Sequence, residues 1–512
     1  MALSTQLPES RPASFFGRSR LLTLAAVLLI LGIGLGLRLM RLTNPPLDLH
    51  AWRQLRSASI ARALYYQMSP DTDPVIRQKA IGLGKYDQLE PNITETLVAY
   101  TYRLAGGVDL WIARLYTIFF WTFGGAALFA LAWRMTSPDG AIVSLAYYLL
   151  LPFGILLSRS FLPEPLMVML ILFAVYAIYR WIETHTWKWA LLSGLVSGAA
   201  VFAKVFAVFP LASVLVLVVL TEWGLRRFWK VPQVWVVAGL AALIPALYYI
   251  FPRPGAGSNY LEGWSLPYLH LLTDVTFYIS WLNRLNSYFN IAILLAAAAS
   301  IMLLEKRGRA ICLGLWIGYV MTGFFVPSLI TSHIYYNAPL IAVIAISLAP
   351  LGMLFFSRLA QQGRFWRIVF MGVALVALAY AAFLGRKPVV AEDYSGEPAR
   401  WETLAKQLPA HSALVGLTDD YNMRLKYYGF TNIAQYPHSF DIDMHILAGG
   451  NFDENADNLN YFKKNTRGAQ FFVITLLDQL DAQPYLKKIL YNHYSIYAQG
   501  ADYIIFDLRN PH

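Results

Sequence analysis

The sequence predicts an all-α polytopic membrane domain of about eleven transmembrane helices, followed by a small C-terminal α/β domain. The 512 residues are 57% hydrophobic and only 14% charged, whereas soluble domains carry about a quarter charged residues. Apolar stretches of about 20 residues recur between residues 21 and 385, and each is long enough to cross roughly 30 Å of hydrocarbon. After residue 385 the pattern changes to short β-rich runs and amphipathic helices.

Apolar segments define the predicted membrane domain, residues 21–385. They lie near 21–41, 112–133, 140–157, 164–181, 187–203, 206–222, 233–251, 288–304, 310–327, 336–356 and 366–385. Basic clusters mark alternate loops: Arg18 and Arg20, Arg226, Arg227 and Lys230, Lys306, Arg307 and Arg309, and Arg358, Arg364 and Arg367. By the positive-inside rule these loops face the cytoplasm, which places the tail 1–20 inside and the C-terminal domain outside.

The net charge of +11 comes from the membrane domain. Residues 386–512 hold 12 of the 41 basic residues but 15 of the 30 acidic ones. The basic excess therefore lies in the loops between spans, where it sets topology, and it does not indicate a nucleic-acid partner. The single cysteine, Cys312, falls inside a predicted span and excludes an intrachain disulfide.

Three segments are predicted on the outer face. The loop 42–111 is too long for a simple connector, and its pieces 51–68 and 93–107 have the helical periodicity of amphipathic helices in the membrane interface. The stretch 252–287 is rich in Gly, Pro, Trp and Tyr. The domain 386–512 contains the β-rich runs SALVGL, FFVITLL and YIIFDL and the helical runs PARWETLAKQL and AQPYLKKILYNHY.

Ionisable residues gather at the outer ends of the predicted spans, where their cost marks them as functional candidates. They are Asp48, His50, Arg53, Glu90, Arg114, Arg159, Glu164, Lys204, His270 and His333. A transporter would more naturally place such groups at the middle of the bilayer. P-loop, GxGxxG, HExxH and Cys/His zinc motifs are absent.

Each candidate carboxylate has two interpretations. Asp48 could act as a general base toward an incoming hydroxyl, or it could cap the helix that follows. Glu90, in QLEPNI, suits a site or a helix cap in a solvated loop. Glu164 lies between two prolines at the mouth of a span, a poor place for mere solvation, although Pro-Glu-Pro also starts helices well.

Basic side chains on the same face favour a phosphate-bearing ligand. Arg159, Lys204 and His333 could each anchor the chain in the interface on their own. Together, beside carboxylates, they form a set that balances the charge of a phosphate.

Five motifs occur in order over residues 20–385. They are LDLHAWRQLRSASIARAL, LEPNITETLVAYTYRLAGGVDLWIARLYTIFF, SRSFLPEPLMVMLILF, AKVFAVFPL and SHIYYNAPLIAVIAI. In order and spacing they resemble the GT-C superfamily of polytopic glycosyltransferases, in the branch that contains protein O-mannosyltransferases and the lipid A aminoarabinose transferase. Many members carry Asp-Glu where this chain has Asp48-Leu49, which leaves Asp48 the sole carboxylate of the first segment.

The resemblance implies an inverting glycosyltransferase of the inner membrane whose active site lies on the periplasmic side. It implies a polyprenyl-phosphate-linked sugar donor in the lipid bilayer and a lipid, glycan or protein acceptor, with Asp48 as the catalytic base. The expected substrate-binding residues are His50, Arg53, Glu90, Arg159, Glu164, Lys204 and His333. A divalent metal ion, held by Glu90 and His270, is the only cofactor expected.

Two other functions remain open at this point. A transporter or flippase for lipid-linked saccharides would share the spans and the cationic groups, and it should show mid-membrane acids, broken helices or internal pseudo-symmetry. A non-catalytic sugar-binding subunit would have lost carboxylates of the kind retained at Asp48, Glu90 and Glu164.

Overall fold

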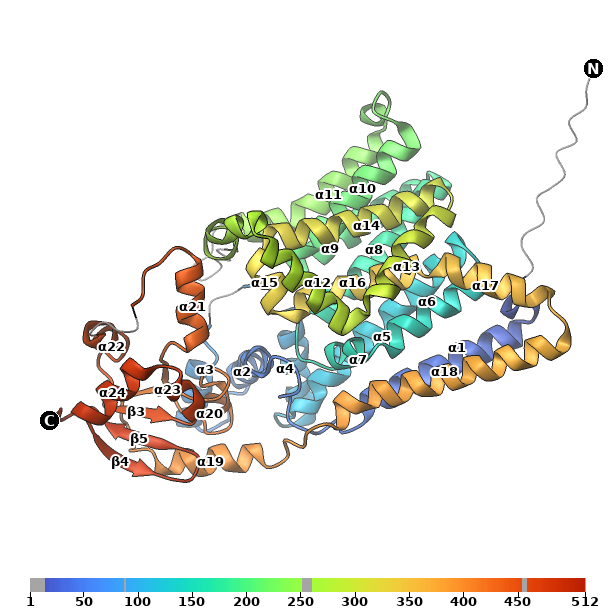
Figure 1. Ribbon diagram of the computed structural model, residues 1–512. Helices are drawn as coiled ribbons and strands as arrows, with labels where there is room; N and C mark the ends of the chain where they lie inside the picture. Colours follow the sequence, from blue (N-terminus) through green and yellow to red (C-terminus); the bar gives the residue numbers. More distant parts are fainter. Residues whose placement is uncertain (1–13, 87–88, 251–259, 454–457, 512) are drawn as a thin grey trace, which may run out of the picture.

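The computed structural model describes residues 14–86, 89–250, 260–453 and 458–511. The first 13 residues of the predicted cytoplasmic tail therefore lie outside the described residues, as do residues 251–259, at the start of the predicted outer stretch. A large helical bundle and a small domain around a β-sheet make up the chain, and three short helices of the loop 42–111 lie between them (Figure 1).

The helical bundle is built from apolar helices that overlap all eleven predicted segments, but in the described residues at most ten candidate spans are found, because Trp187–Ala203 is shorter than a span. The helices are α1 (Arg20–Leu39), α5 (Leu110–Met135), α6 (Pro138–Leu150), α7 (Pro152–Ser158), α8 (Glu164–Thr184), α9 (Trp187–Ala203), α10 (Val208–Trp223), α11 (Pro232–Tyr249), α12 (Val275–Phe289), α13 (Ile291–Ser300), α14 (Lys306–Phe325), α15 (Pro327–Ser332), α16 (Ala338–Ser347), α17 (Ala349–Gln361) and α18 (Arg364–Val390). Within the described residues, eight helices are long and apolar enough to cross a membrane, or up to ten if each of two bent pairs counts as one span. The chain is thus an integral multi-pass membrane protein.

Two bent helix pairs depart from the apolar pattern: the predicted span 140–157 is bent, and the predicted span 288–304 is preceded by the helix Val275–Phe289, which lies largely in the predicted outer stretch 252–287. The helices α6 and α7 meet at 64°, where Leu151 is extended because the following Pro152 disfavours helical backbone. The helices α12 and α13 meet at 90°. There Asn290 adopts a φ of 64°, and its side chain accepts a hydrogen bond of 2.9 Å from the backbone of Ala292 to start α13.

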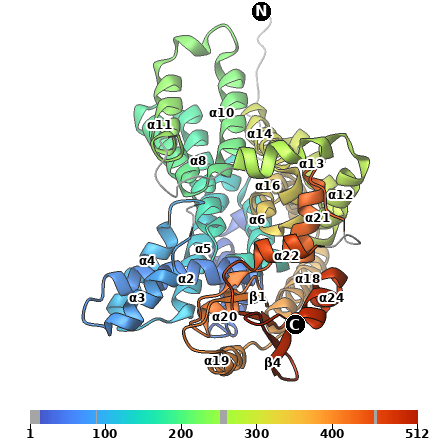
Figure 2. The ribbon, with the colours of Figure 1, turned by 90° about the vertical axis from the view of Figure 1, so that its left-hand side faces the viewer.

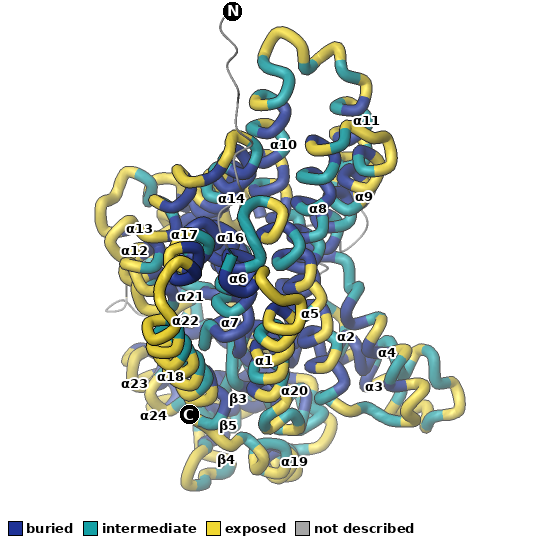
Figure 3. The backbone as a smooth tube through the Cα atoms, turned by 90° about the vertical axis from the view of Figure 1, so that its right-hand side faces the viewer, coloured by how far each residue is buried: buried dark blue, intermediate teal, exposed yellow. Residues whose placement is uncertain are grey.

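Burial divides the bundle into a core and a rim (Figure 3). The helices α8 and α16 are largely buried, whereas in α18 only Gly385 and Val389 are buried, as expected for a helix that faces lipid. Close helix packing uses small residues, because a Cβ on Gly314 of α14 would lie only 2.6 Å from the Cα of Val214 in α10.

The loop 42–111 folds into α2 (Ala51–Gln67), α3 (Pro74–Leu83) and α4 (Ile93–Ala105), which lie together at one side of the molecule (Figure 2). The prediction of two helices at 51–68 and 93–107 is confirmed. Apart from the half-buried Trp52, α2 is buried from Ala51 to Ala63 on polar and apolar faces alike, so protein covers its apolar face, and its position at the membrane interface stays a prediction. It packs against α3, α4 and the helix α20 of the C-terminal domain.

The C-terminal domain holds a five-stranded sheet of order β2-β1-β3-β5-β4. The strands are β1 (Leu414–Leu417), β2 (Ala434–Gln435), β3 (Phe471–Ile474), β4 (Ser495–Gln499) and β5 (Ile504–Asp507), and the helices are α19 (Glu397–Gln407), α20 (Met423–Tyr427), α21 (Ser439–Leu447), α22 (Leu459–Asn465), α23 (Leu477–Asp481) and α24 (Pro484–His493). The strands β2, β1 and β3 are parallel, and β5 and β4 complete the sheet in antiparallel pairing. The predicted α/β domain, with its three β-rich runs and two helical runs, is confirmed.

Candidate active site

Asp48 lies in a buried ion-pair network between the end of α1 and the start of α2. Its Oδ2 is 3.2 Å from Nη2 of Arg114 and 3.6 Å from Nε of Arg159, and its Oδ1 accepts a 3.2 Å hydrogen bond from Nε2 of Gln54. The Asp48 side chain is 11% exposed, and the two arginine side chains are 1% exposed.

The alternative interpretation of Asp48 as a helix cap is wrong. The N-cap residue of α2 is His50, whose backbone is left-handed with a φ of 46°, and no side chain caps the helix. The carboxylate of Asp48 is directed instead toward α5 and the end of α7, where the two arginines are placed.

Arg114 and Arg159 also fix the backbone that carries Asp48. Arg114, in α5, donates to main-chain carbonyls between residues 41 and 45, and Nη2 of Arg159 donates to the carbonyl of Arg41 at 2.9 Å. Burial, and then the neighbouring Arg114, lower the pKa of Arg159 to about 10. The side chain of Arg159 therefore stays charged at neutral pH, and its buried Nη1 has no hydrogen-bond partner among the described residues.

Two further buried ion pairs lie beside this network. Arg53, in α2, pairs with Glu90, and Lys204, at the end of α9, pairs with Glu164 at the start of α8. Burial raises the pKa of Glu90, but the positive charges of Arg53, Lys204 and Arg56 outweigh it and hold that pKa below its usual value. One oxygen of each glutamate and Nη1 of Arg53 are buried without a hydrogen-bond partner among the described residues.

Aromatic and imidazole rings enclose these pairs. The ammonium of Lys204 lies 5.2 Å and 5.0 Å from the ring centres of Tyr335 and Tyr336. The ring of His50 stacks on that of His333 at 5.4 Å and meets the ring of Tyr335 edge-on at 4.8 Å. Burial, followed by nearby cations, lowers the pKa of His50 to about 4 and that of His333 to about 3, so both rings are neutral at pH 7.

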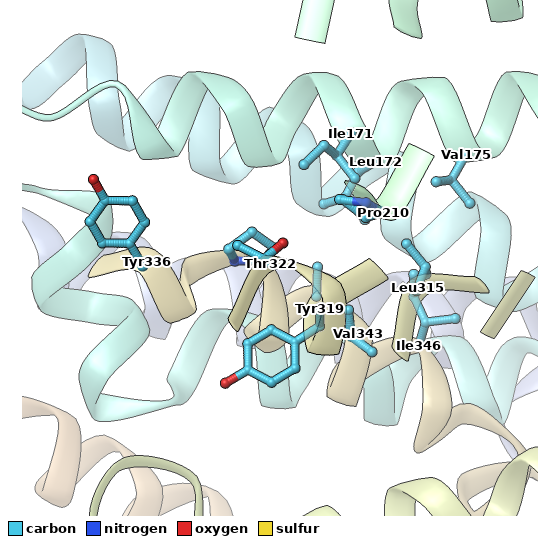
Figure 4. A pocket seen from close by; sticks show the side chains of 12 residues that line it. Ile171, Leu172, Val175, Pro210, Leu315, Tyr319, Thr322, Tyr336, Val343 and Ile346 are labelled. Carbon is cyan, nitrogen blue, oxygen red and sulfur yellow. The ribbon is translucent and has the colours of Figure 1, made fainter. Parts of the chain in front are cut away.

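An apolar pocket begins at Tyr336 and continues between α8, α14 and α16 (Figure 4). Aliphatic side chains such as Leu172, Leu315 and Ile346 line it. Toward the middle of α8, the surroundings of Tyr336 are therefore mainly aliphatic.

Most of the predicted site residues are brought together, although they come from distant parts of the chain. The first group is Asp48 with Arg114 and Arg159, and the second is His50, Arg53, Glu90, Glu164, Lys204 and His333. Sequence reasoning assigned no role to Gln54, which joins Asp48 to the backbone N–H of Phe161 through its Oε1 at 2.9 Å. A single sequence gives no sign that a glutamine will be buried. Tyr335 and Tyr336 lie in SHIYYN, within one of the five motifs, but they were not predicted as site residues.

The predicted metal ligands do not lie in a metal-binding arrangement. His270 is exposed, and its Nδ1 lies 3.1 Å from the carbonyl oxygen of Pro267, while Glu90 faces the cation of Arg53. No three His, Cys, Asp or Glu side chains of the described residues gather into a candidate metal site. The divalent metal ion stays a prediction.

The charge of the site suits an anion. Four cations, Arg53, Arg114, Arg159 and Lys204, surround three carboxylates, Asp48, Glu90 and Glu164. Because both histidines are neutral, the site has a net positive charge and buried guanidinium N–H groups without acceptors. A phosphate oxygen would supply those acceptors through charge-assisted hydrogen bonds.

Known proteins resemble the chain both in sequence and in fold. Residues 90–249 match the family model described as dolichyl-phosphate-mannose-protein mannosyltransferase. The fold is similar to that of ArnT from Cupriavidus metallidurans bound to undecaprenyl phosphate, with a TM-score of 0.54 and 15% identity over 94% of this chain and 98% of that one. It is also similar to the oligosaccharyltransferase AglB from Archaeoglobus fulgidus in complex with an inhibitory peptide and a dolichol-phosphate, with a TM-score of 0.57 and 11% identity over 97% of this chain and 75% of that one.

The apo form of the Archaeoglobus fulgidus oligosaccharyltransferase matches with a TM-score of 0.61 and 12% identity, over 97% of this chain and 77% of that one. No curated protein sequence matches the chain. The structural matches show the GT-C fold, and together with the family model they confirm the resemblance to GT-C glycosyltransferases of the O-mannosyltransferase and aminoarabinose transferase type that the sequence motifs indicate.

Proposed function

We propose that the protein is an inverting glycosyltransferase that moves a sugar from a polyprenyl-phosphate donor to an acceptor hydroxyl at the outer face of the membrane. The observation that carries the proposal is the buried carboxylate of Asp48 among cations whose donors lack acceptors. The matched family model and the polyprenyl-phosphate ligands of ArnT and AglB support the same donor class.

The proposed step uses Asp48 as the base. Its carboxylate takes the proton of the acceptor hydroxyl as that oxygen attacks the anomeric carbon of the donor sugar, and the bond from that carbon to the phosphate oxygen breaks. The polyprenyl phosphate leaves with the electron pair. Arg53, Arg159 and Lys204 stabilise the charge that develops on it, because their positive charges are already fixed in place by ion pairs before the reaction.

The other site residues orient the substrates in this proposal. The unpartnered oxygens of Glu90 and Glu164 accept hydrogen bonds from sugar hydroxyls, and the neutral rings of His50 and His333 donate or accept at the same surface. A sugar in this position would have its polar groups satisfied by residues that the fold has already desolvated.

The orientation of the protein in the inner membrane belongs to the same proposal. The basic loops face the cytoplasm, and the site and the C-terminal domain lie in the periplasm. A reporter that is active only in the cytoplasm, fused after His512, should stay silent. Reporter activity would reverse the topology and place the site inside.

A transporter or flippase is the second candidate, because the two bent helix pairs are a feature that transporters share. The bends fall at Leu151 and Asn290, and neither carries an ionisable side chain. Incubation of the purified protein with a panel of polyprenyl-phosphate sugars and candidate acceptors separates the two functions. Release of polyprenyl phosphate supports the transferase, whereas movement of intact donor across a liposome membrane without release supports the flippase.

A further inference from the structure

A second cluster of polar and aromatic side chains lies at the carboxyl ends of the parallel strands of the C-terminal sheet, an end of the sheet that we call the carboxyl edge. Residues 418–422 follow β1, His438 is the third residue after β2, and Thr475 follows β3 directly. In open α/β sheets, ligands bind outside the carboxyl ends of the parallel strands. Three neighbouring strands thus deliver their following residues to one edge, which is where a ligand is expected.

The turn after β1 places Tyr421 at this edge. Asp420, Tyr421 and Asn422 have φ values of 48°, 55° and 66°, a left-handed conformation that L-residues rarely adopt in succession. The side chain of Asn422 holds the turn, since its Oδ1 accepts a 2.8 Å bond from Oγ1 of Thr418 and its Nδ2 donates to the carbonyl of Ala434 at 2.9 Å.

His438 provides a hydrogen-bonding group that no described residue uses. Its ring stacks on that of Tyr421, with centres 4.2 Å apart. One ring nitrogen accepts from the backbone of Asp441 in the capping box of α21, whereas Nε2 is buried without a partner among the described residues, and the residue is only 7% exposed. A neutral imidazole that accepts at one nitrogen carries its proton on the other, so Nε2 is a buried donor that lacks an acceptor.

The edge faces the membrane domain. The ring of Tyr421 lies 6.3 Å from that of Trp52, which immediately precedes Arg53 in α2. On the same side, the hydroxyl of Tyr268 donates to the carbonyl of Met444 in α21 at 3.2 Å. Figure 1 shows α20 and α21 on the side of the C-terminal domain nearest to α2 and α15. A molecule at Tyr421 would therefore lie beside the helix that carries Arg53.

The charge of this edge is opposite to that of the membrane site. Burial lowers the pKa of His438, and the negative charges of Asp441, Asp419 and Asp478 oppose that shift; Oδ2 of Asp441 also accepts from the backbone N–H of His438 at 2.8 Å. The carboxylate of Asp419 accepts from Oγ1 of Thr475 at 2.7 Å. An anionic edge disfavours a phosphate, which the cations of the membrane site attract, so the two sites suit different ligands.

We propose that this edge, formed by Trp52, Tyr421, Asp419 and His438, is a binding subsite for the acceptor and that it takes an uncharged saccharide. Aromatic faces pack against the apolar face of a sugar ring, carboxylates accept from its hydroxyl groups, and the Nε2 donor of His438 pairs with a hydroxyl oxygen. The inference rests on the proposed transferase function, which it deepens by assigning the chemical class of the acceptor and the domain that selects it.

The test measures saccharide binding without any donor. The purified full-length protein in lipid nanodiscs is applied to an array of immobilised neutral glycans, phosphorylated glycans and hydroxyl-bearing peptides. We expect retention on a subset of the neutral glycans, and a loss of at least about tenfold in affinity for Tyr421→Ala and for Asp419→Asn, since each removes one of the few convergent groups that fix a ligand in such a site. The matched control is Tyr497→Ala, which removes an exposed ring from β4, the outermost strand on the side of the sheet opposite to β2, and should leave binding unchanged.

A thermal melt of each variant verifies its fold, and Asp419→Asn, which keeps the shape of the side chain, decides the matter if Tyr421→Ala fails to fold. Absence of glycan retention by the wild type, preference for phosphorylated glycans or peptides, or equal binding by Asp419→Asn and the control would each overturn the proposal. Failure of the transferase proposal would show separately, as absence of polyprenyl phosphate release with retained glycan binding.

Discussion

Replacement of Asp48 by asparagine tests both its chemistry and its place in the fold. An asparagine caps a helix about as well as an aspartate, so a capping role would leave stability nearly unchanged. The structure leads to a different expectation, because the change leaves Arg114 and Arg159 buried with no counter-charge. At 3.2 Å and 3.6 Å, with an effective dielectric constant near 20, each pair attracts with about 5 kcal/mol.

The net loss is smaller than that attraction, since burying the charges has a cost of its own. Removal of one partner from a buried ion pair typically destabilises by about 3–5 kcal/mol. Loss of general-base catalysis lowers the rate by about 10²–10⁴. We therefore expect Asp48→Asn to lower both the melting temperature and the turnover of the protein that remains folded.

A comparison with Arg114→Gln separates the two effects. That variant breaks one of the two ion pairs of Asp48 but keeps its carboxylate beside Arg159, so its melting temperature should also fall, while its turnover per folded protein should stay well above that of Asp48→Asn. The assay is release of polyprenyl phosphate per folded, monodisperse protein. Equal turnover of the folded fractions of Asp48→Asn and Arg114→Gln would refute the assignment of Asp48 as the base.

Three further expectations follow from the same contacts. Lys204→Met should lower the free energy of unfolding by about 3–5 kcal/mol, because it leaves Glu164 buried without its cation. The double variant with Glu164→Gln should recover the melting temperature of the wild type but not its activity. The free energy of unfolding should be constant above about pH 6.5 and should decline as the pH falls from there toward 4. Burial lowers the pKa values of His50 and His333 to about 4 and 3, so the unfolded chain binds those two protons first as the pH falls. A melting temperature independent of pH over this range would contradict the neutral state of the two stacked rings. Arg62→Gln should increase hydrogen exchange in α20, because the guanidinium of Arg62 donates to the carbonyl of Tyr427 at 2.8 Å and lies over the ring of Tyr427. Arg62→Lys should retain part of the protection. Unchanged exchange in both variants would show that this contact does not hold the two domains together.

The sequence predicted the membrane helices because hydropathy is a local property that twenty neighbouring residues report together. It predicted β1, β3 and β5 for the same reason, since their β-branched and aromatic residues are buried. The strand β4 was missed because it lies at the sheet edge and is mostly exposed, so it lacks a hydrophobic run. The two-residue strand β2 is too short to produce a pattern.

The site was predictable as a set of residues but not as an arrangement. Each ionisable residue stands out where it follows an apolar run, yet the pairing of Asp48 with Arg114 joins positions 66 apart, and the pairing of Arg53 with Glu90 joins positions 37 apart. A single sequence carries no record of such partners. The burial of α2 was unpredictable for a related reason, because the polar face of that helix is covered by α20, which lies more than 350 residues later in the chain.

The position of α2 gives a physical reason for the C-terminal domain. Gln54 of α2 holds Asp48 from one side, Arg53 pairs with Glu90 in the cation cluster, and Trp52 meets Tyr421 of the C-terminal domain. Three consecutive side chains thus contact the proposed base, the proposed phosphate site and the proposed acceptor subsite. Because they share one buried helix, a shift of the C-terminal domain would move α2 and displace all three groups together. In the proposed mechanism, docking of that domain through α20 would fix the relative placement of donor and acceptor that an attack on the anomeric carbon requires.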